Sequence, residues 1–162
     1  MRLILMRHAK SDWSLDADDH ARPLNARGEA SARILGDWLR AESYLPDDVL
    51  CSTSCRTRQT LTLLKLSAPV RFERDLYHAS PDTLLNVLRS GTGRSLLVIG
   101  HNPGIASLAN TLVNIRPAHV RFRDYPTGAT LIVDFDISDW SQLSPGTGNA
   151  RDFVIPRELM SV

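Results

Sequence analysis

Short apolar runs alternate with amphipathic segments along most of this chain, and that alternation restricts the folds open to it. Ser95–Gly100 is the most apolar run, and Arg2–Met6 is a second one. Both are short and are followed by polar turns, which is typical of strands buried on both faces of a sheet. Strands that alternate with helices predict an α/β fold, here a three-layer α/β/α sandwich with a largely parallel sheet and helices on both faces.

The remaining elements follow from the same kinds of signal. Asn25 is placed to cap a helix whose apolar face carries the side chains of Ala30, Ile34, Leu35, Trp38 and Leu39. Ser54 is placed to cap a helix over Cys55–Leu66, and Ser80 with Pro81 begins another. Further strands are predicted at 49–51, 70–73 and 128–135, with a last one at 153–155 that pairs with the strand before it.

Length and charge narrow the class of protein. The chain has 162 residues, of which 43% are hydrophobic, and we expect a single domain over 1–162. Its net charge is +1, from 19 basic and 18 acidic residues, so nothing points to nucleic acid or a membrane surface as a partner. No leader or spanning segment is evident, and we expect a cytoplasmic protein. The two cysteines lack the spacing and companions of a zinc site.

Cationic and imidazole side chains follow three of the predicted strands. Arg7 and His8 follow the first strand, Arg56 lies just after the second, and His101 follows the run at 95–100. Each alone has an ordinary structural explanation. The carboxyl ends of parallel strands meet at one edge of a sheet, however, so the four side chains are expected to converge there. Arginine offers a planar fork of donors for phosphate oxygens, and a neutral histidine nitrogen is a nucleophile. The pattern predicts a phosphoryl-transfer site.

Four motifs in the same order carry a resemblance to a known family. They are Leu5–Ser11, Arg22-Pro23-Leu24, Ser52-x-x-x-Arg56-x-x-Gln59-Thr60 and Ile99–Pro103. Together they resemble the signatures of the histidine phosphatase superfamily, the phosphoglycerate mutase-like proteins. The short length and the Asp-rich stretch before Arg22 are most similar to the SixA-type phosphohistidine phosphatases.

This resemblance implies roles for individual residues. His8 would attack phosphorus and form a phosphohistidine enzyme, while Arg7, Arg56 and a protonated His101 would hold the phosphoryl oxygens. Arg22 and Asn102 are expected to add contacts to the substrate. No cofactor and no metal is expected, because cationic side chains do the work of a metal.

Two positions depart from the family pattern. The glycine that usually follows the first histidine is Ala9 here, and His78 stands where many relatives carry a proton-donating glutamate. We hold two interpretations of His78: a proton donor, since histidine titrates near neutral pH, or a solvated loop residue.

Three functions remain open on the sequence. The first is a phosphatase acting on a phosphorylated histidine of a phosphotransfer protein in signal transduction, with a phosphate or sulfate anion as a simple ligand of the site. The second is a phosphatase for sugar phosphates or nucleotides, and the third is a phosphate-binding module without activity. The stretch 67–100 leaves little room for a lid, which favours a protein substrate.

Overall fold

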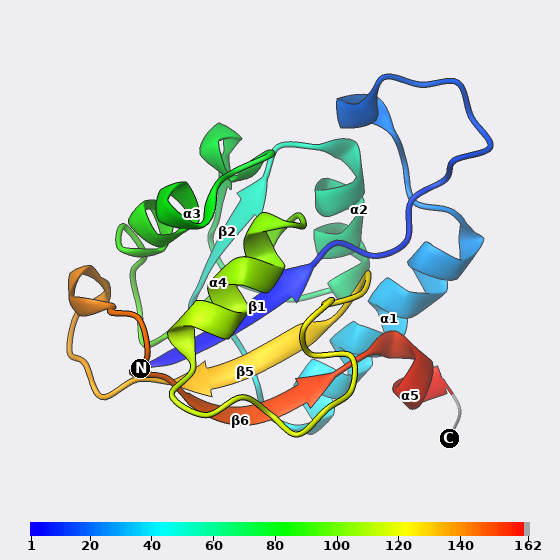
Figure 1. Ribbon diagram of the computed structural model, residues 1–162. Coiled ribbons are helices and arrows are strands. Elements are labelled where there is room, and N and C mark those ends of the chain that lie inside the picture. The colour runs from blue at the N-terminus through cyan, green and yellow to red at the C-terminus, as the bar shows by residue number, and fades with distance from the viewer. Residues whose placement is uncertain (161–162) are drawn as a thin grey trace.

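In a computed structural model, which describes residues 1–160, the chain forms a six-stranded sheet with helices on both faces (Figure 1). The strands are β1 Arg2–Arg7, β2 Asp48–Ser52, β3 Val70–Glu73, β4 Ser95–Gly100, β5 Thr130–Asp134 and β6 Asn149–Val154. The helices are α1 Ala26–Ala41, α2 Cys55–Leu64, α3 Pro81–Leu88, α4 Gly104–Leu112 and α5 Pro156–Met160. Three short 3₁₀ helices complete the described part: η1 Asp19–Ala21, η2 Arg74–Leu76 and η3 Trp140–Gln142.

The sheet is largely parallel, as predicted. Its strand order is β3-β2-β4-β1-β5-β6, and β3, β2, β4 and β1 run parallel to one another. β5 is antiparallel to β1, and β6 pairs antiparallel with β5, which confirms the expected pairing of the last two strands. The central position of β1 and β4 brings the residues that follow them to the middle of one sheet edge.

The two faces of the sheet pack against different helices. In β1 the side chains of Leu3 and Leu5 belong to the core under α3 and α4, whereas Ile4 and Met6 pack against α1 and α2. All four side chains are fully buried, so the strand is apolar on both faces, as a central strand of a covered sheet requires.

Three predicted helix starts are confirmed by capping hydrogen bonds. The side chains of Asn25, Ser54 and Ser80 accept from backbone N–H groups three residues later, at the beginnings of α1, α2 and α3. The helix predicted over Cys55–Leu66 ends earlier, at Leu64, because Lys65 takes the left-handed conformation that closes α2.

The predicted buried face of α1 is wrong in part. Leu35 and Leu39 are buried, but Ala30 is exposed and Ile34 and Trp38 are only half-buried. The cause is a close approach of α1 to α2 at Gly36, where a Cβ atom would lie 2.3 Å from the carbonyl oxygen at the end of α2. This contact turns the glycine side of the helix toward the core. Hydrophobic periodicity does not detect it, because glycine has no apolar side chain.

Candidate active site

The register between the two central strands brings two histidines together. Arg7 pairs with Gly100 across β1 and β4, so His8 and His101 are the first residues beyond neighbouring strands. The backbone N–H of His8 donates to the Gly100 carbonyl at 3.1 Å, and the two imidazole rings lie 5.2 Å apart between centroids. Parallel pairing thus sets the distance between them.

A pocket of about 210 Å³ opens at this edge of the sheet. Its lining comes from five regions of the chain: the end of β1 with the segment after it, the start of α2, the segment before α3, the turn after β4, and the loop before β5. The residues are Arg7, His8, Lys10, Ser11, Trp13, Arg56, His78, His101, Asn102 and Thr127. Six of the seven residues singled out from the sequence therefore line one pocket, and Arg22 is the exception.

The tautomer of His8 is set by its backbone partner. Its Nδ1 lies 2.7 Å from the Ala9 carbonyl oxygen, which only accepts, so Nδ1 carries the proton and Nε2 keeps its lone pair. Burial lowers the pKa of His8 to about 3, and the charges of Arg7 and Arg56 act in the same direction. At neutral pH the imidazole is uncharged and nucleophilic at Nε2.

Both ring nitrogens of His101 have hydrogen-bond partners: the guanidinium of Arg56 on one side and the hydroxyl of Ser52 on the other. A guanidinium nitrogen of Arg56 donates to its Nδ1 at 3.3 Å, and its Nε2 faces the Ser52 hydroxyl at 2.8 Å. Burial lowers the pKa of His101 to about 2, helped by the neighbouring His8 and Arg56. The expectation that His101 is protonated is wrong in this arrangement, because a guanidinium cannot accept a hydrogen bond and Nδ1 must therefore be bare.

Arg7 and Arg56 supply the positive charge of the pocket. Arg7 donates to the Tyr125 carbonyl at 3.2 Å, and its buried Nε has no hydrogen-bond partner among residues 1–160. Burial lowers the pKa of Arg7, and the nearby charge of Arg56 lowers it further. Both guanidinium groups line the pocket, and such a site favours an anionic ligand.

Asp19 was missed by the sequence analysis. Its carboxylate accepts from the Tyr77 hydroxyl at 2.5 Å and from Arg56 at 3.1 Å, and one of its oxygens lies 3.2 Å from Nε2 of His78. The hydrogen bond from Tyr77, followed by that from Arg56, lowers the pKa of Asp19 to about 2. The Asp-rich stretch at 16–19 was a signal, but nothing in it distinguishes the aspartate that contacts Arg56 and Tyr77 from those that face solvent.

His78 lies at the rim of the pocket. Its side chain is 61% exposed, its backbone is left-handed with φ 53°, and its ring lies 6.2 Å from that of His101. Nε2 of His78 lies within ion-pair distance of the Asp19 carboxylate, 3.2 Å from its nearest oxygen.

Arg22 and Asn102 have structural roles that the sequence analysis did not anticipate. Arg22 donates to the carbonyl oxygens of Asp12, Leu15 and Ala17, and its guanidinium lies 4.0 Å from the Trp13 ring centroid. It shapes the loop that brings Trp13 to the pocket and does not line the pocket itself.

Asn102 lines the pocket, but both of its amide hydrogens are used within the protein. They go to the carbonyl oxygens of Asp124 and Tyr125, both at 2.9 Å. Its Oδ1 accepts from the backbone of Ala106 in the first turn of α4. The expected substrate contacts of these two residues are therefore replaced by contacts that hold loops in place.

The second signature motif holds the segment that follows His8. Thr60 accepts from the Ala9 backbone at 3.0 Å and donates to the Arg56 carbonyl at 2.7 Å, which ties α2 to the residue after His8. The backbone φ of Ala9 is not positive. An alanine methyl group at this position, where the family usually has glycine, therefore causes no backbone strain.

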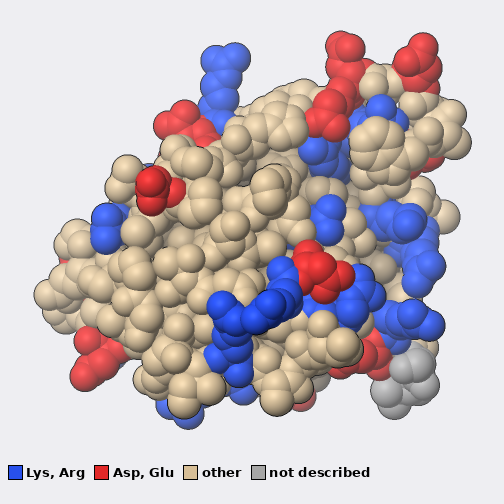
Figure 2. All heavy atoms as spheres, in the orientation of Figure 1, with Lys and Arg blue, Asp and Glu red and all other residues tan. Residues whose placement is uncertain are grey.

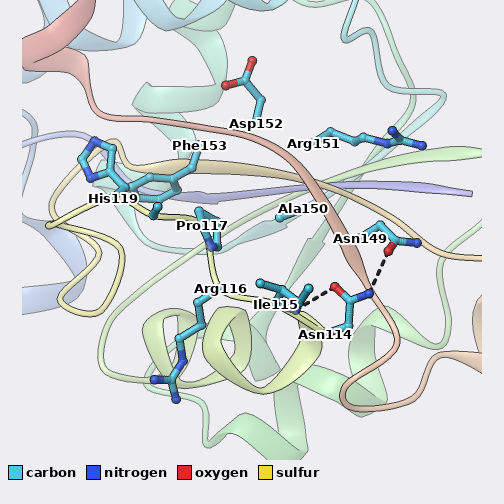
Figure 3. A pocket seen from close by; sticks show the side chains of 11 residues that line it. Asn114, Ile115, Arg116, Pro117, His119, Asn149, Ala150, Arg151, Asp152 and Phe153 are labelled. Atoms are coloured by element: carbon cyan, nitrogen blue, oxygen red, sulfur yellow. Dashed lines mark hydrogen bonds between the residues drawn. The ribbon is translucent and has the colours of Figure 1, made fainter.

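A larger pocket, of about 530 Å³, lies elsewhere, between β6 and the loop at 114–119 (Figure 3). Its polar side chains are mostly paired: Asn114 with Asn149, Arg151 with Asp134, and His119 with Glu158. His119 is the one histidine in its described lining, whereas three histidines line the pocket beside β1 and β4. Among residues 1–160, no three His, Cys, Asp or Glu side chains converge as metal ligands, and no helix is long and apolar enough to cross a bilayer.

Comparison with known proteins agrees with the geometry. The sequence model of the histidine phosphatase superfamily (branch 1) matches residues 3–80. A Nakamurella multipartitia structure assigned as phosphohistidine phosphatase SixA has a TM-score of 0.86 and 30% identity, covering 96% of this chain and 95% of its own. A second SixA assignment, from Agrobacterium tumefaciens, has a TM-score of 0.78 and 25% identity, covering 96% of this chain and 97% of its own.

A relative known from its sequence matches nearly the whole chain. An uncharacterized Mycobacterium tuberculosis protein is 36% identical over 159 residues, which is 94% of this chain and 100% of that protein. The motif order, the pocket and these likenesses agree, and the chain belongs to the histidine phosphatase superfamily as a phosphatase of the SixA type.

Proposed function

We propose that this phosphatase removes the phosphoryl group from phosphohistidine on a signalling protein, with His8 as the nucleophile. The observation that carries the proposal is the hydrogen bond from His8 Nδ1 to the Ala9 carbonyl, which leaves Nε2 bare and orients the ring from behind. A nucleophile oriented in this way by a second group is the usual arrangement of covalent catalysis.

The reaction has two steps. Nε2 of His8 attacks phosphorus, a nitrogen–phosphorus bond forms on the enzyme, and the bond to the substrate nitrogen breaks. A phosphorylated imidazole that carries a proton on its other nitrogen leaves as neutral imidazole. Water then attacks the phosphoryl group on His8, which releases inorganic phosphate and restores the free imidazole. Arg7 and Arg56 hold the phosphoryl oxygens and stabilise the charge of the transition state.

The rim of the pocket supports a protein substrate. The exposed side chains of Trp13 and His78 border it, and between β3 and α3 the chain has only η2 and a short connecting segment. A phosphorylated side chain projecting from another protein can reach such a pocket. The neutral leaving group also needs no proton from the enzyme, which suits a site without a glutamate donor. The likeness to proteins assigned as SixA favours the same substrate class.

One observation favours a second candidate, a small-molecule phosphatase. Nε2 of His78 lies 3.2 Å from Asp19, and this pairing of an imidazole with a carboxylate resembles an oriented acid. An alkoxide leaving group from a sugar or a serine would require such a donor.

A comparison of substrates separates the two candidates. Turnover is measured on a phosphorylated histidine phosphotransfer domain, on a phosphoserine peptide and on a hexose phosphate. Proton donation to an alkoxide is commonly worth about 10²–10⁴-fold in rate, so phosphohistidine is expected to react fastest. Faster turnover of the hexose phosphate overturns the proposal and favours the small-molecule candidate.

A further inference from the structure

A second pocket, of about 240 Å³, adjoins the catalytic one and is strongly cationic. Lys10 and Thr127 line both pockets. The second pocket adds Arg27 from α1, Arg121 from the loop before β5, and Arg157 from α5, and none of its lining residues within 1–160 is acidic. Figure 2 shows Lys and Arg side chains gathered on the surface over the beginning of α1 and beside α5.

The charge of this pocket is not neutralised internally. Arg121 pairs with Asp124, but the side chains of Lys10, Arg27 and Arg157 have no hydrogen-bond or ion-pair partner among residues 1–160. The whole chain has a net charge of only +1, so the local excess does not reflect a basic protein. Uncompensated positive charge beside a reaction centre attracts anions.

The exposure of these cationic side chains favours a protein ligand over a small anion. Arg56, which faces the phosphoryl position, is only 6% exposed and is held by three hydrogen bonds. Lys10, Arg27 and Arg157 are instead exposed side chains. Exposed charges that can reorient steer the approach of an opposite charge on a partner surface, whereas a small phosphate is bound by buried, fixed donors.

The floor between the cations is apolar. Ile155, Pro156, Pro126 and Met160 contribute to it, and Met160 is 39% exposed. An apolar centre with a charged rim is the usual composition of a protein interface.

We infer that this cationic pocket is the docking surface for an acidic patch beside the phosphorylated histidine of the protein substrate. The inference rests on the proposed function. Docking there holds the partner while its phosphohistidine enters the adjoining catalytic pocket through the edge shared at Lys10 and Thr127. The surface therefore sets which phosphoproteins are accepted and leaves the chemical step to His8.

The test is a charge reversal, Arg27→Glu with Arg157→Glu, compared with a matched reversal, Arg94→Glu with Arg116→Glu. Arg94 and Arg116 are exposed and line neither of these two pockets. The substrates are a phosphorylated histidine phosphotransfer domain with an acidic surface, and phosphoramidate, which is too small to reach the second pocket. Thermal unfolding checks that each variant is folded, and Arg27→Gln with Arg157→Gln provides a milder second variant.

We expect the Arg27 and Arg157 reversal to lower kcat/KM on the phosphoprotein by about tenfold or more and to weaken its salt dependence. Its kcat/KM on phosphoramidate stays within about twofold of the parent. The glutamine variant falls in between, and the matched reversal keeps the parental selectivity.

Equal losses in the two reversals, or equal losses on the two substrates, overturn the docking surface and leave the proposed function intact. A selective loss on a hexose bisphosphate in place of the phosphoprotein assigns the pocket to a small anion and also overturns it. If the parental protein does not dephosphorylate the phosphoprotein at all, the proposed function is wrong and the docking surface falls with it.

Discussion

Arg56 donates to Nδ1 of His101 at 3.3 Å, and the same guanidinium also contacts the carboxylate of Asp19. One side chain therefore links a residue that lies beside the nucleophile to the acidic residue at the pocket rim. Its planar fork is what allows contacts in two directions, and a lysine ammonium has no such geometry.

Arg56→Lys is expected to lower kcat by about 10²–10³, the usual cost of losing one donor to a developing negative charge. Steady-state kinetics on phosphoramidate measures it. Arg58→Lys is the matched control, because Arg58 is exposed on the same helix, donates to the Thr53 carbonyl and stacks on the Phe72 ring, away from the pocket. If the Arg56 variant keeps kcat within a few-fold of the parent, Arg56 does not hold the phosphoryl group.

His78→Asn tests the proton donor without disturbing the backbone. Asparagine tolerates the left-handed conformation found at this position, whereas the imidazole is removed. We expect little change on phosphohistidine and a loss of about 10²-fold or more on a hexose phosphate, if His78 donates to the alkoxide. An ester rate that does not change would show that His78 is a solvated loop residue.

Gly28→Ala probes the support behind the nucleophile. A Cβ atom at Gly28 would lie 2.0 Å from the carbonyl oxygen of Lys10, two residues after His8, so α1 and that segment must separate. We expect a loss of stability of about 1–3 kcal/mol and a fall in kcat. Ala30→Gly, at an exposed position of the same helix, is the control: it costs up to about 1 kcal/mol and leaves kcat unchanged.

The fold was largely predictable because its signals are local. Apolar strands, capping residues and turn residues lie within a few positions of one another, as at Asn25, Ser54 and Ser80. The antiparallel direction of β5 was not predicted, because it depends on how the chain returns to the sheet. The 3₁₀ helices and α5 were not predicted either, because such short elements depend on tertiary contacts. The burial of Gly36 depends on its contact with the end of α2, which periodicity cannot show.

The sequence indicated which residues lie close together in the pocket, but not their protonation or their hydrogen-bond partners. Strand ends indicated Arg7, His8, Arg56 and His101, but the protonation of His101 depends on Arg56, which is 45 positions away along the chain. The distinction between a substrate contact and a loop support also requires coordinates. Arg22 has the same chemistry as Arg56, and only its carbonyl partners show that it holds a loop.

The stability of the protein should fall in acid before most carboxylates are protonated. In the unfolded chain a histidine takes up its proton near pH 6.5, whereas the pKa of His8 is about 3 and that of His101 about 2 in the folded protein. The unfolded state thus binds more protons below pH 6.5, and stability falls as the pH decreases from 6.5 toward 3.

Denaturant unfolding at several pH values measures this dependence. His8→Asn removes one of the two buried histidines and should flatten the decline between pH 6.5 and 3. An equally steep decline in the variant would show that His8 is not buried in its neutral form.

The most direct test of the central claim is to trap the phosphoryl group on the enzyme. The protein is mixed with a phosphohistidine substrate, quenched within milliseconds in alkali, digested and analysed by mass spectrometry. We predict a phosphoryl group on His8, formed and lost at rates that account for turnover, and no trapped species in His8→Ala, whose activity falls by several orders of magnitude although it remains folded. Near-parental turnover by His8→Ala, or a phosphoryl group on another residue, would contradict the account.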